Sequence, residues 1–244
     1  MKTVKKSIWA LGLIACMLPL HSCDLDDDDD TVLLRPTALV TVYPDETDGF
    51  TMQLDDSTSI VPTNMKTSPF GQKQVRALVN YTVDPTTYGS KSNTVHVNWI
   101  DSIRTKYPVT TQGADDDEVF GNDPIEIVKD WVSVAEDGFI TLRIRTLWGG
   151  KATHMVNLVS GVNAENAYEF DLRHNAKGDT TGELGDAIIA FNLNALWADR
   201  PKEVKVKLNW TSFSGEKSTE FDLKMHADAL TTVTGEPSSS LRAE

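Results

Sequence analysis

Apolar and polar residues alternate with a period of two along most of the sequence after residue 31. The pattern is clearest in Val204–Trp210 and recurs in Ile140–Ile144, Tyr168–Leu172 and Phe221–Met225. Because successive side chains of a strand point to opposite faces, this period predicts strands with one face in a core and one in water. Antiparallel sheets expose one face in this way, whereas parallel sheets bury both. The sequence therefore predicts an all-β protein.

Turn residues separate the alternating segments. Asp48-Gly49 and Asp137-Gly138 each lie between two apolar runs and predict hairpin turns, since glycine adopts the positive φ that such turns need. No long segment shows the 3.6-residue period of an amphipathic helix. The best helix candidate, Gly185–Trp197, fits a strand equally well.

The distribution of the runs predicts two domains. About five strands in 32–106 fit a small OB-like barrel, and about seven in 125–226 fit an antiparallel β-sandwich, although one continuous sandwich would give similar runs. The polar, aperiodic segment Thr110–Asp123 indicates the boundary between them. We place the OB-like domain at 32–118 and the β-sandwich at 119–229. Residues 230–244 are predicted to form a flexible tail.

The N-terminus has the order of a secretory signal peptide. Three lysines (Lys2, Lys5 and Lys6) precede the apolar run Ile8–Leu20, which is too short to span a bilayer as a helix. Residues 1–22 are therefore expected to be removed by cleavage between Ser22 and Cys23. Cys16 is lost with them, so the mature chain keeps a single cysteine, which cannot form an internal disulfide.

Cys23 is the predicted lipidation site. Leu20-His21-Ser22-Cys23 resembles the lipobox of bacterial lipoproteins, in which the cysteine becomes the acylated first residue of the mature chain. His21 departs from the small residue that is usual at its position. Acyl chains on Cys23 would hold the protein at a membrane. A free thiol beside an ordinary cleavage site is the alternative.

An acidic run follows the cysteine, with six aspartates in 24–30. It lacks the alternate ligands, the glycine and the distant glutamate of a calcium loop. A block of like charges stays solvated and extended, so residues 23–31 are predicted to be an acidic tether. Acidic residues after a lipidated cysteine also resemble the surface-export signal of lipoproteins in Gram-negative gut and oral anaerobes. This resemblance implies outer-membrane attachment facing outward, with the periplasmic face as second choice.

Six longer segments together resemble the NigD-like lipoprotein family over most of the mature chain. They are 54–64, 75–84, 95–106, 121–149, 183–196 and 208–222, for example "VRALVNYTVD" and "GNDPIEIVKDWVSVAEDGFITLRIRTLWG". The resemblance implies an N-terminal OB-like domain, a C-terminal β-sandwich domain and a lipidated location in the cell envelope. It also implies an association with bacteriocin immunity. It supplies no catalytic or ligand-binding residue.

The sequence contains no motif that specifies catalysis or metal binding. Asp115-Asp116-Asp117-Glu118 is the densest carboxylate group, and a solvated loop is favoured there over a calcium site or an acid–base pair. Gly215–Thr219 fits a hairpin better than a phosphate loop. The histidines of the mature chain lack zinc-motif spacing, and no Gly-x-Ser-x-Gly elbow is present. These histidines are His96, His154, His174 and His226. We therefore predict no catalytic residue, no metal and no cofactor.

The tryptophans divide by their place in the pattern. Trp99 and Trp210 lie on the apolar side of their alternating runs and are predicted to pack in a core. Trp131 and Trp148 border turns, where an exposed ring would be available to stack on a sugar.

The formal net charge of −13 argues against nucleic acid as a partner, even for an OB-like domain, because an acidic chain repels phosphate backbones. We expect a non-enzymatic, lipid-anchored envelope protein that binds a protein or glycan partner. Two alternatives stay open. One is a bacteriocin-immunity-associated factor, which rests on the resemblance alone. The other is a hydrolase of surface polysaccharide, which needs two carboxylates converging in a cleft.

Overall fold

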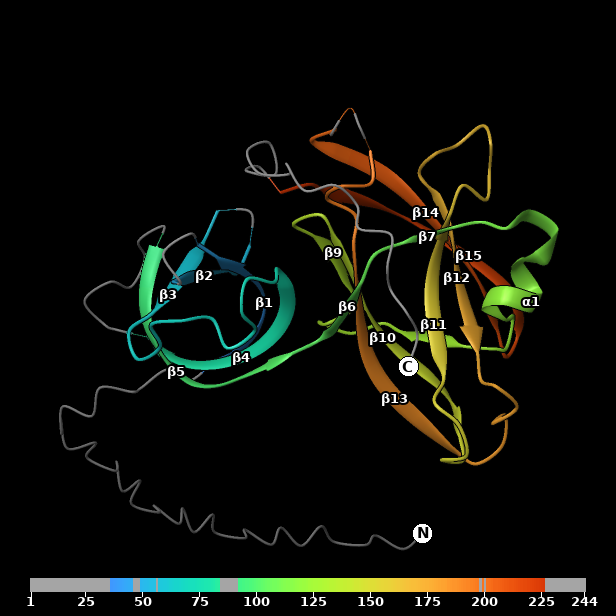
Figure 1. Ribbon diagram of the computed structural model, residues 1–244, viewed down its shortest axis with the longest axis horizontal. Helices are drawn as coiled ribbons and strands as arrows, with labels where there is room; N and C mark the ends of the chain where they lie inside the picture. The colour runs from blue at the N-terminus through green and yellow to red at the C-terminus, as the bar shows by residue number, and fades with distance from the viewer. Residues whose placement is uncertain are drawn as a thin grey trace, which may run out of the picture. The chain divides into compact units, whose positions relative to one another are not determined.

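The computed structural model describes residues 36–45, 49–55, 57–83, 92–197, 199 and 201–226, all of which belong to one compact unit. This part of the chain consists mainly of strands (Figure 1) and confirms the all-β prediction. None of its helices is long and apolar enough to cross a membrane. The predicted signal peptide, Cys23, the acidic tether and the predicted tail 230–244 lie outside the described residues.

Five strands close into the N-terminal barrel in the order β1-β2-β3-β5-β4, with β4 paired back onto β1. Alternate side chains fill the barrel, including Val40, Met52, Ile60, Val79 and Val95, each at most 1% exposed. The predicted OB-like barrel is confirmed. Its strands are β1 (Thr37–Pro44), β2 (Phe50–Gln53), β3 (Ser59–Pro62), β4 (Val75–Val83) and β5 (Ser92–Ser102).

A β-bulge reverses the phase of β5. Asn80 pairs with Trp99 whereas Tyr81 pairs with Val97, so Asn98 is an extra residue on β5. Val97 is buried, but the bulge turns Trp99 outward, where it is 44% exposed. The prediction that Trp99 packs in the core was wrong for this reason. One extra residue exchanges the two faces of a strand without changing the apolar pattern that the sequence shows.

The chain passes from the barrel to the sandwich through two short strands. β6 (Arg104–Lys106) pairs in parallel with β13 (Glu183–Asn192), and β7 (Val109–Thr110) pairs in parallel with β11 (Met155–Ser160). Each therefore adds an edge strand to a different sheet of the sandwich. The predicted domain boundary, between residues 118 and 119, lies C-terminal to both of these strands. The two strands are too short to show a periodic pattern in the sequence.

Two sheets form the C-terminal sandwich. One has the order β6-β13-β10-β8, with β9 also paired to β10, and the other has the order β15-β14-β12-β11-β7. Most pairs are antiparallel, but β12 and β14 run parallel, as do the pairs made by β6 and β7. The helix candidate 185–197 is mostly strand β13. The remaining strands are β8 (Glu126–Val128), β9 (Val134–Glu136), β10 (Phe139–Trp148), β12 (Glu169–Asn175), β14 (Glu203–Ser212) and β15 (Gly215–Lys224).

The inward faces of the two sheets form the main core. Phe170, Phe191, Val206 and Leu208 are fully buried there. Trp210 belongs to the same core at 8% exposed, which confirms its prediction. Burying large apolar side chains of this kind contributes about 1.5–3 kcal/mol each.

The hairpin between β9 and β10 leads to a prediction. Asp137 and Gly138 both have positive φ, 55° and 75°, as a two-residue type I′ turn requires. A Cβ on Gly138 would lie 1.8 Å from Oδ1 of Asn194, whose Nδ2 donates to the Asp137 carbonyl. We expect Gly138→Ala to lower the free energy of unfolding by about 2–3 kcal/mol, measured by urea unfolding.

Gly185→Ala is the matched control. A Cβ on Gly185 would meet the Trp148 Cβ at 3.6 Å, which is ordinary contact, so the change should stay within about 0.5 kcal/mol. Equal effects of the two substitutions would show that the turn geometry is not what limits position 138.

Candidate functional site

Apolar side chains from both domains meet at a junction between the barrel and the sandwich. Leu39 of β1 and Leu78 of β4 pack with Ala190 and Ile188 of β13, and Ile103 joins them from the connecting segment. The β10–β13 sheet is therefore apolar on both of its faces in this region. This small core holds the barrel and the sandwich together.

Arg76 is the central polar group of this junction. The side chain extends from β4 and is 1% exposed. Its Nη1 donates to Thr41 Oγ1 (2.7 Å), its Nε to Thr141 Oγ1 (3.3 Å) and its Nη2 to Glu136 Oε1 (2.5 Å). The guanidinium carbon also lies 5.7 Å from the centroid of the Phe139 ring. A buried guanidinium needs such partners, so Arg76 fixes β1 and β4 against β9 and β10.

Asp137 makes a second polar link across the junction. Tyr43 of β1 donates its hydroxyl to Asp137 Oδ2 (2.7 Å), and Nδ1 of His226 lies 2.6 Å from Asp137 Oδ1. The rings of Tyr43 and His226 stack with their centroids 4.2 Å apart. Burial, and then the charge of Asp137, raises the pKa of Tyr43 far above its usual value. The phenol therefore stays protonated and acts as a donor.

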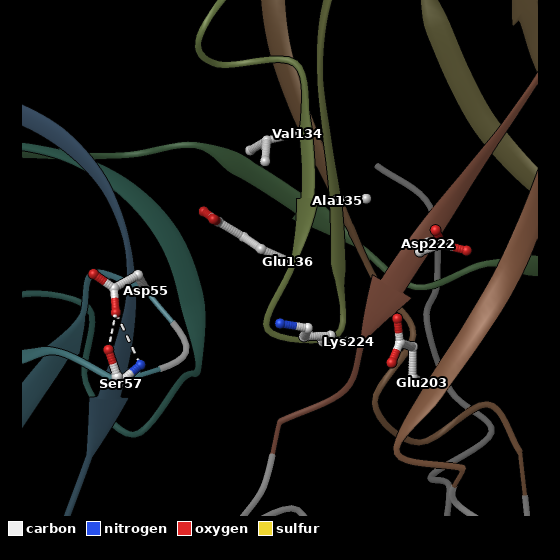
Figure 2. Close-up of a pocket in the computed structure, with 8 residues that line it drawn as sticks. All are labelled: Asp55, Ser57, Val134, Ala135, Glu136, Glu203, Asp222 and Lys224. Carbon is white, nitrogen blue, oxygen red and sulfur yellow. Dashed lines mark hydrogen bonds between the residues drawn. The ribbon is translucent and has the colours of Figure 1, made fainter.

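A pocket of about 400 Å³ opens between the barrel and the sandwich. Figure 2 shows the two barrel residues on one side and six sandwich residues on the other, with the Glu136 carboxylate pointing toward the barrel side. Four carboxylates face one ammonium group, so the pocket is acidic. The lining residues are Asp55, Ser57, Val134, Ala135, Glu136, Glu203, Asp222 and Lys224.

The carboxylate of Asp55 is held in its ionised form. Its Oδ1 accepts hydrogen bonds from the backbone N–H of Ser57 and Thr58 and from the Ser57 hydroxyl, at 2.8–2.9 Å. Burial raises the pKa of Asp55, but these hydrogen bonds outweigh burial and lower the pKa below its usual value. A general acid needs a raised pKa, so Asp55 suits binding better than proton donation.

Two further carboxylates of the pocket already have cationic partners. Glu136 is paired with Arg76, and Asp222 accepts a hydrogen bond from Lys205 Nζ at 2.8 Å. The buried Arg76 fixes the position of Glu136, whereas the side chains of Asp222 and Lys205 are both more than 60% exposed and are held less firmly. An acidic pocket of this kind can recognise cationic or hydrogen-bond-donating groups.

The acidic run Asp115–Glu118 forms a short helical segment, η1 (Gly113–Asp115) and α1 (Asp116–Phe120), rather than only a solvated loop. Asp116 is buried and accepts hydrogen bonds from Gln112 N (2.6 Å) and Thr111 Oγ1 (2.5 Å). These bonds hold the start of α1. Among the described residues, no group of three or more His, Cys, Asp or Glu side chains is placed to hold a metal ion.

A cluster that sequence reasoning missed contains two of the scattered histidines. β11 and β12 are antiparallel neighbours, which brings His154 Nδ1 within 3.0 Å of His174 Nε2. The Nδ1 of His174 lies 3.2 Å from the Pro124 carbonyl, so it donates its proton there. Burial, and then the neighbouring His154, lowers the pKa of His174. Nothing in the spacing of these residues along the chain could have predicted the contact.

Asp179 completes this cluster. It is fully buried, and its carboxylate accepts hydrogen bonds from the backbone N–H groups of Gly149 (3.0 Å), Lys151 (2.9 Å) and Ala152 (3.4 Å). His154 Nε2 lies 3.7 Å from Asp179 Oδ2. Burial raises the pKa of Asp179, but the backbone hydrogen bonds and the nearby histidine lower it below its usual value. The carboxylate therefore fixes the loop after β10.

The remaining tryptophans, His96 and the segment Gly215–Thr219 lie apart from these clusters. Trp131 and Trp148 are 60% and 56% exposed, as expected for residues beside turns. Trp197 donates its Nε1–H to the Ala167 carbonyl at 3.3 Å. His96 is exposed on β5, and Gly215–Thr219 begins β15 after a two-residue hairpin turn, as expected.

Family models match both domains of the chain. The NigD-like N-terminal OB domain matches residues 39–103, and the NigD-like C-terminal beta sandwich domain matches residues 107–223. The chain belongs to the NigD-like family. The two matched ranges correspond to the barrel and to the sandwich with its edge strand β7, so the fold of this NigD-like protein agrees with its family. No curated protein matches it in sequence.

Solved structures share this fold. A Parabacteroides distasonis protein described as toxin-related is 29% identical with a TM-score of 0.66, over 80% of this chain and 96% of that one. A NigD-like immunity protein from Bacteroides caccae is 17% identical with a TM-score of 0.55, over 78% and 97%. A Bacteroides fragilis protein described as a lipoprotein is 13% identical with a TM-score of 0.56, over 78% and 98%. The last two likenesses show the fold alone.

Proposed function

We propose that this NigD-like protein is a lipid-anchored, non-enzymatic protein of the cell envelope that binds a protein or glycan partner. The junction pocket carries the proposal. Both domains build it, Arg76 and Asp137 hold the surrounding strands in place, and three of its four carboxylates (Asp55, Glu136 and Asp222) are engaged in ion pairs or a turn. Such a site favours recognition through charge and hydrogen bonds over proton transfer.

The acidic pocket favours a partner that presents cationic or hydrogen-bond-donating groups. The formal net charge of −13 extends the same preference to long-range encounter, because it repels polyanions and attracts basic surfaces. We therefore do not propose nucleic acid as a partner.

The anchor rests on the N-terminal sequence and gains support from the likeness to a protein described as a lipoprotein. Two or more acyl chains on one residue give lasting attachment to a membrane. We expect Cys23→Ser to move the protein from the membrane fraction to the soluble fraction. His21→Ala, which leaves the cysteine in place, should stay in the membrane fraction. Equal distribution of the two variants would contradict lipidation at Cys23.

We place the anchor on the outer membrane with the protein facing outward. Protease added to intact cells should then remove the wild-type protein. Full protection from the protease would contradict this orientation and favour the periplasmic face.

The non-enzymatic part of the proposal has its own test. Purified mature protein should release no reducing ends from surface polysaccharide of the producing cells. Release that disappears in Glu203→Gln or Asp222→Asn would instead support a hydrolase using the pocket carboxylates.

Immunity to a bacteriocin is a second candidate, because a relative of the same fold is named a NigD-like immunity protein. A deletion strain should then become more sensitive to the bacteriocin. Unchanged sensitivity would count against this function and leave the binding proposal intact.

A further inference from the structure

A second cavity, of about 270 Å³, lies on the outer face of the sandwich, away from the residues of the junction pocket. Its floor is the outward face of β12 and β14, where Asp171 is paired with Asn209 in the strand register. Arg173 and Thr211 follow them on the same face, and α1 contributes Asp117 to the wall. The cavity is therefore lined mainly by polar residues of the sheet, together with Leu172 and Trp210.

The guanidinium of Arg173 organises one side of this cavity. Its Nη1 donates to Asp117 Oδ1 (2.5 Å) and its Nη2 to Asp171 Oδ2 (3.0 Å), while Asn209 Nδ2 donates to Asp171 Oδ1 (3.2 Å). Among the described residues, nothing accepts a hydrogen bond from the buried Nε of Arg173. The side chains are thus preset, and one buried donor has no partner.

The opposite side of the cavity lacks a donor. The Thr211 hydroxyl lies 2.5 Å from Asn122 Oδ1 and 2.9 Å from Glu216 Oε1. A hydroxyl carries one proton, so Thr211 can donate to only one of these two oxygens. In the described part of the chain, no hydrogen bond uses Asn209 Oδ1 either. Acceptor oxygens without a donor therefore line this side of the cavity, and the Arg173 guanidinium lies on the other side.

The geometry points to a neutral saccharide unit as the ligand of this cavity. Sugar hydroxyls both donate and accept, so they can donate to the free oxygens and accept from the Arg173 guanidinium that lines the cavity. Asp117, Asp171 and Glu216 outnumber the single cation Arg173, so an anionic ligand is disfavoured. The small volume suits one sugar ring better than an extended chain. This inference rests on the proposed binding function and selects the glycan class for this cavity.

The test is a titration of isotope-labelled mature protein, followed by the shifts of backbone amide signals. The probes are glucose, galactose, mannose and N-acetylglucosamine. We expect at least one of them to give saturable shifts at Asp171, Asn209 and Thr211, with a dissociation constant in the millimolar range.

Two variants connect the shifts to the cavity. Asn209→Ala and Asn122→Ala should each weaken binding at least about tenfold, since they remove side-chain oxygens that would accept hydrogen bonds from the sugar. Lys205→Ala, on the same strand as Asn209 but outside the cavity, should bind like wild type. The dispersion of the amide spectrum reports whether each variant is folded.

Three results would overturn the inference. They are no saturable shift with any of the four sugars, shifts that both cavity variants leave unchanged, and saturable shifts at these amides with calcium chloride alone. Partner binding at the junction pocket is measured separately by charge reversal at Glu203. If no sugar binds while the partner still binds at the junction pocket, the saccharide inference is therefore overturned and the proposed function is not.

Discussion

Arg76→Ala should lower the free energy of unfolding by about 3–5 kcal/mol, the usual cost of removing one partner of a buried ion pair. The substitution leaves Glu136 without its cation and takes the donor away from the hydroxyls of Thr41 and Thr141. It also leaves a void beside the Phe139 ring. Urea unfolding followed by circular dichroism and tryptophan fluorescence measures the loss.

The same variant should separate the unfolding of the two domains. Arg76 links β1 and β4 of the barrel to β9 and β10 of the sandwich, so its removal weakens the coupling more than either core. We expect the two probes to report different midpoints in the variant, which is the sign of a transition that is no longer two-state, and the loss of about 3–5 kcal/mol then applies to the first of the two steps.

Arg145→Ala is the control for charge. Arg145 also pairs with a carboxylate, Asp186, at 2.6 Å, but its side chain is 41% exposed. Solvent screens such pairs, so its removal should cost much less than the loss of Arg76. Losses of similar size would contradict the view that burial at the junction makes Arg76 important.

Asp179→Ala should cost about as much stability as Arg76→Ala. The buried carboxylate accepts three backbone N–H groups from the loop after β10 and faces His154. Removing it leaves those donors without a partner and frees the loop that begins at Gly149. Asp222→Ala, an exposed carboxylate paired with Lys205, is the control and should cost much less. Thermal unfolding of both variants measures the difference.

The pH dependence of stability tests the same cluster. The folded protein lowers the pKa of Asp179, so this group stabilises fully above its unfolded-state pKa of about 3.9. That contribution is lost as the pH falls through the lowered value. Asp179→Asn should therefore be less stable than wild type at neutral pH and lose less stability on acidification below about pH 4. Parallel curves for the two proteins would contradict this assignment.

His174 also makes the protein less stable as the pH falls, but its effect begins at a higher pH than that of Asp179. Burial and His154 lower its folded-state pKa, so the unfolded chain binds a proton first as the pH falls below about 6.5. Wild-type stability should begin to fall there, and His174→Gln should remove this early part of the loss.

The strands of this protein could be predicted because apolar and polar residues alternate in their sequences. Trp99 was misplaced since the bulge at Asn98 changes the phase of β5 without a signature. The segment 188–191 did carry a signal for the junction: it is apolar without interruption, as expected for a strand buried on both faces.

The polar centres could not be predicted in the same way. Arg76, Glu136 and Thr141 become neighbours only when the barrel packs on β10. His154 and Asp179 meet through strand pairing and loop closure rather than through spacing in the chain. The pocket residues likewise come from β9, the ends of β14 and β15 and a barrel loop. Such sites depend on tertiary contacts that composition and periodicity do not encode.

Crosslinking on intact cells tests the binding role of the junction pocket most directly. Glu203→Lys reverses a charge that lines the pocket, and Glu220→Lys makes the same change on β15 outside it. We expect wild type and Glu220→Lys to capture the same partner and Glu203→Lys to lose it. Capture of the same partner by all three proteins would contradict the pocket as the binding site, and capture by none would contradict the binding function itself.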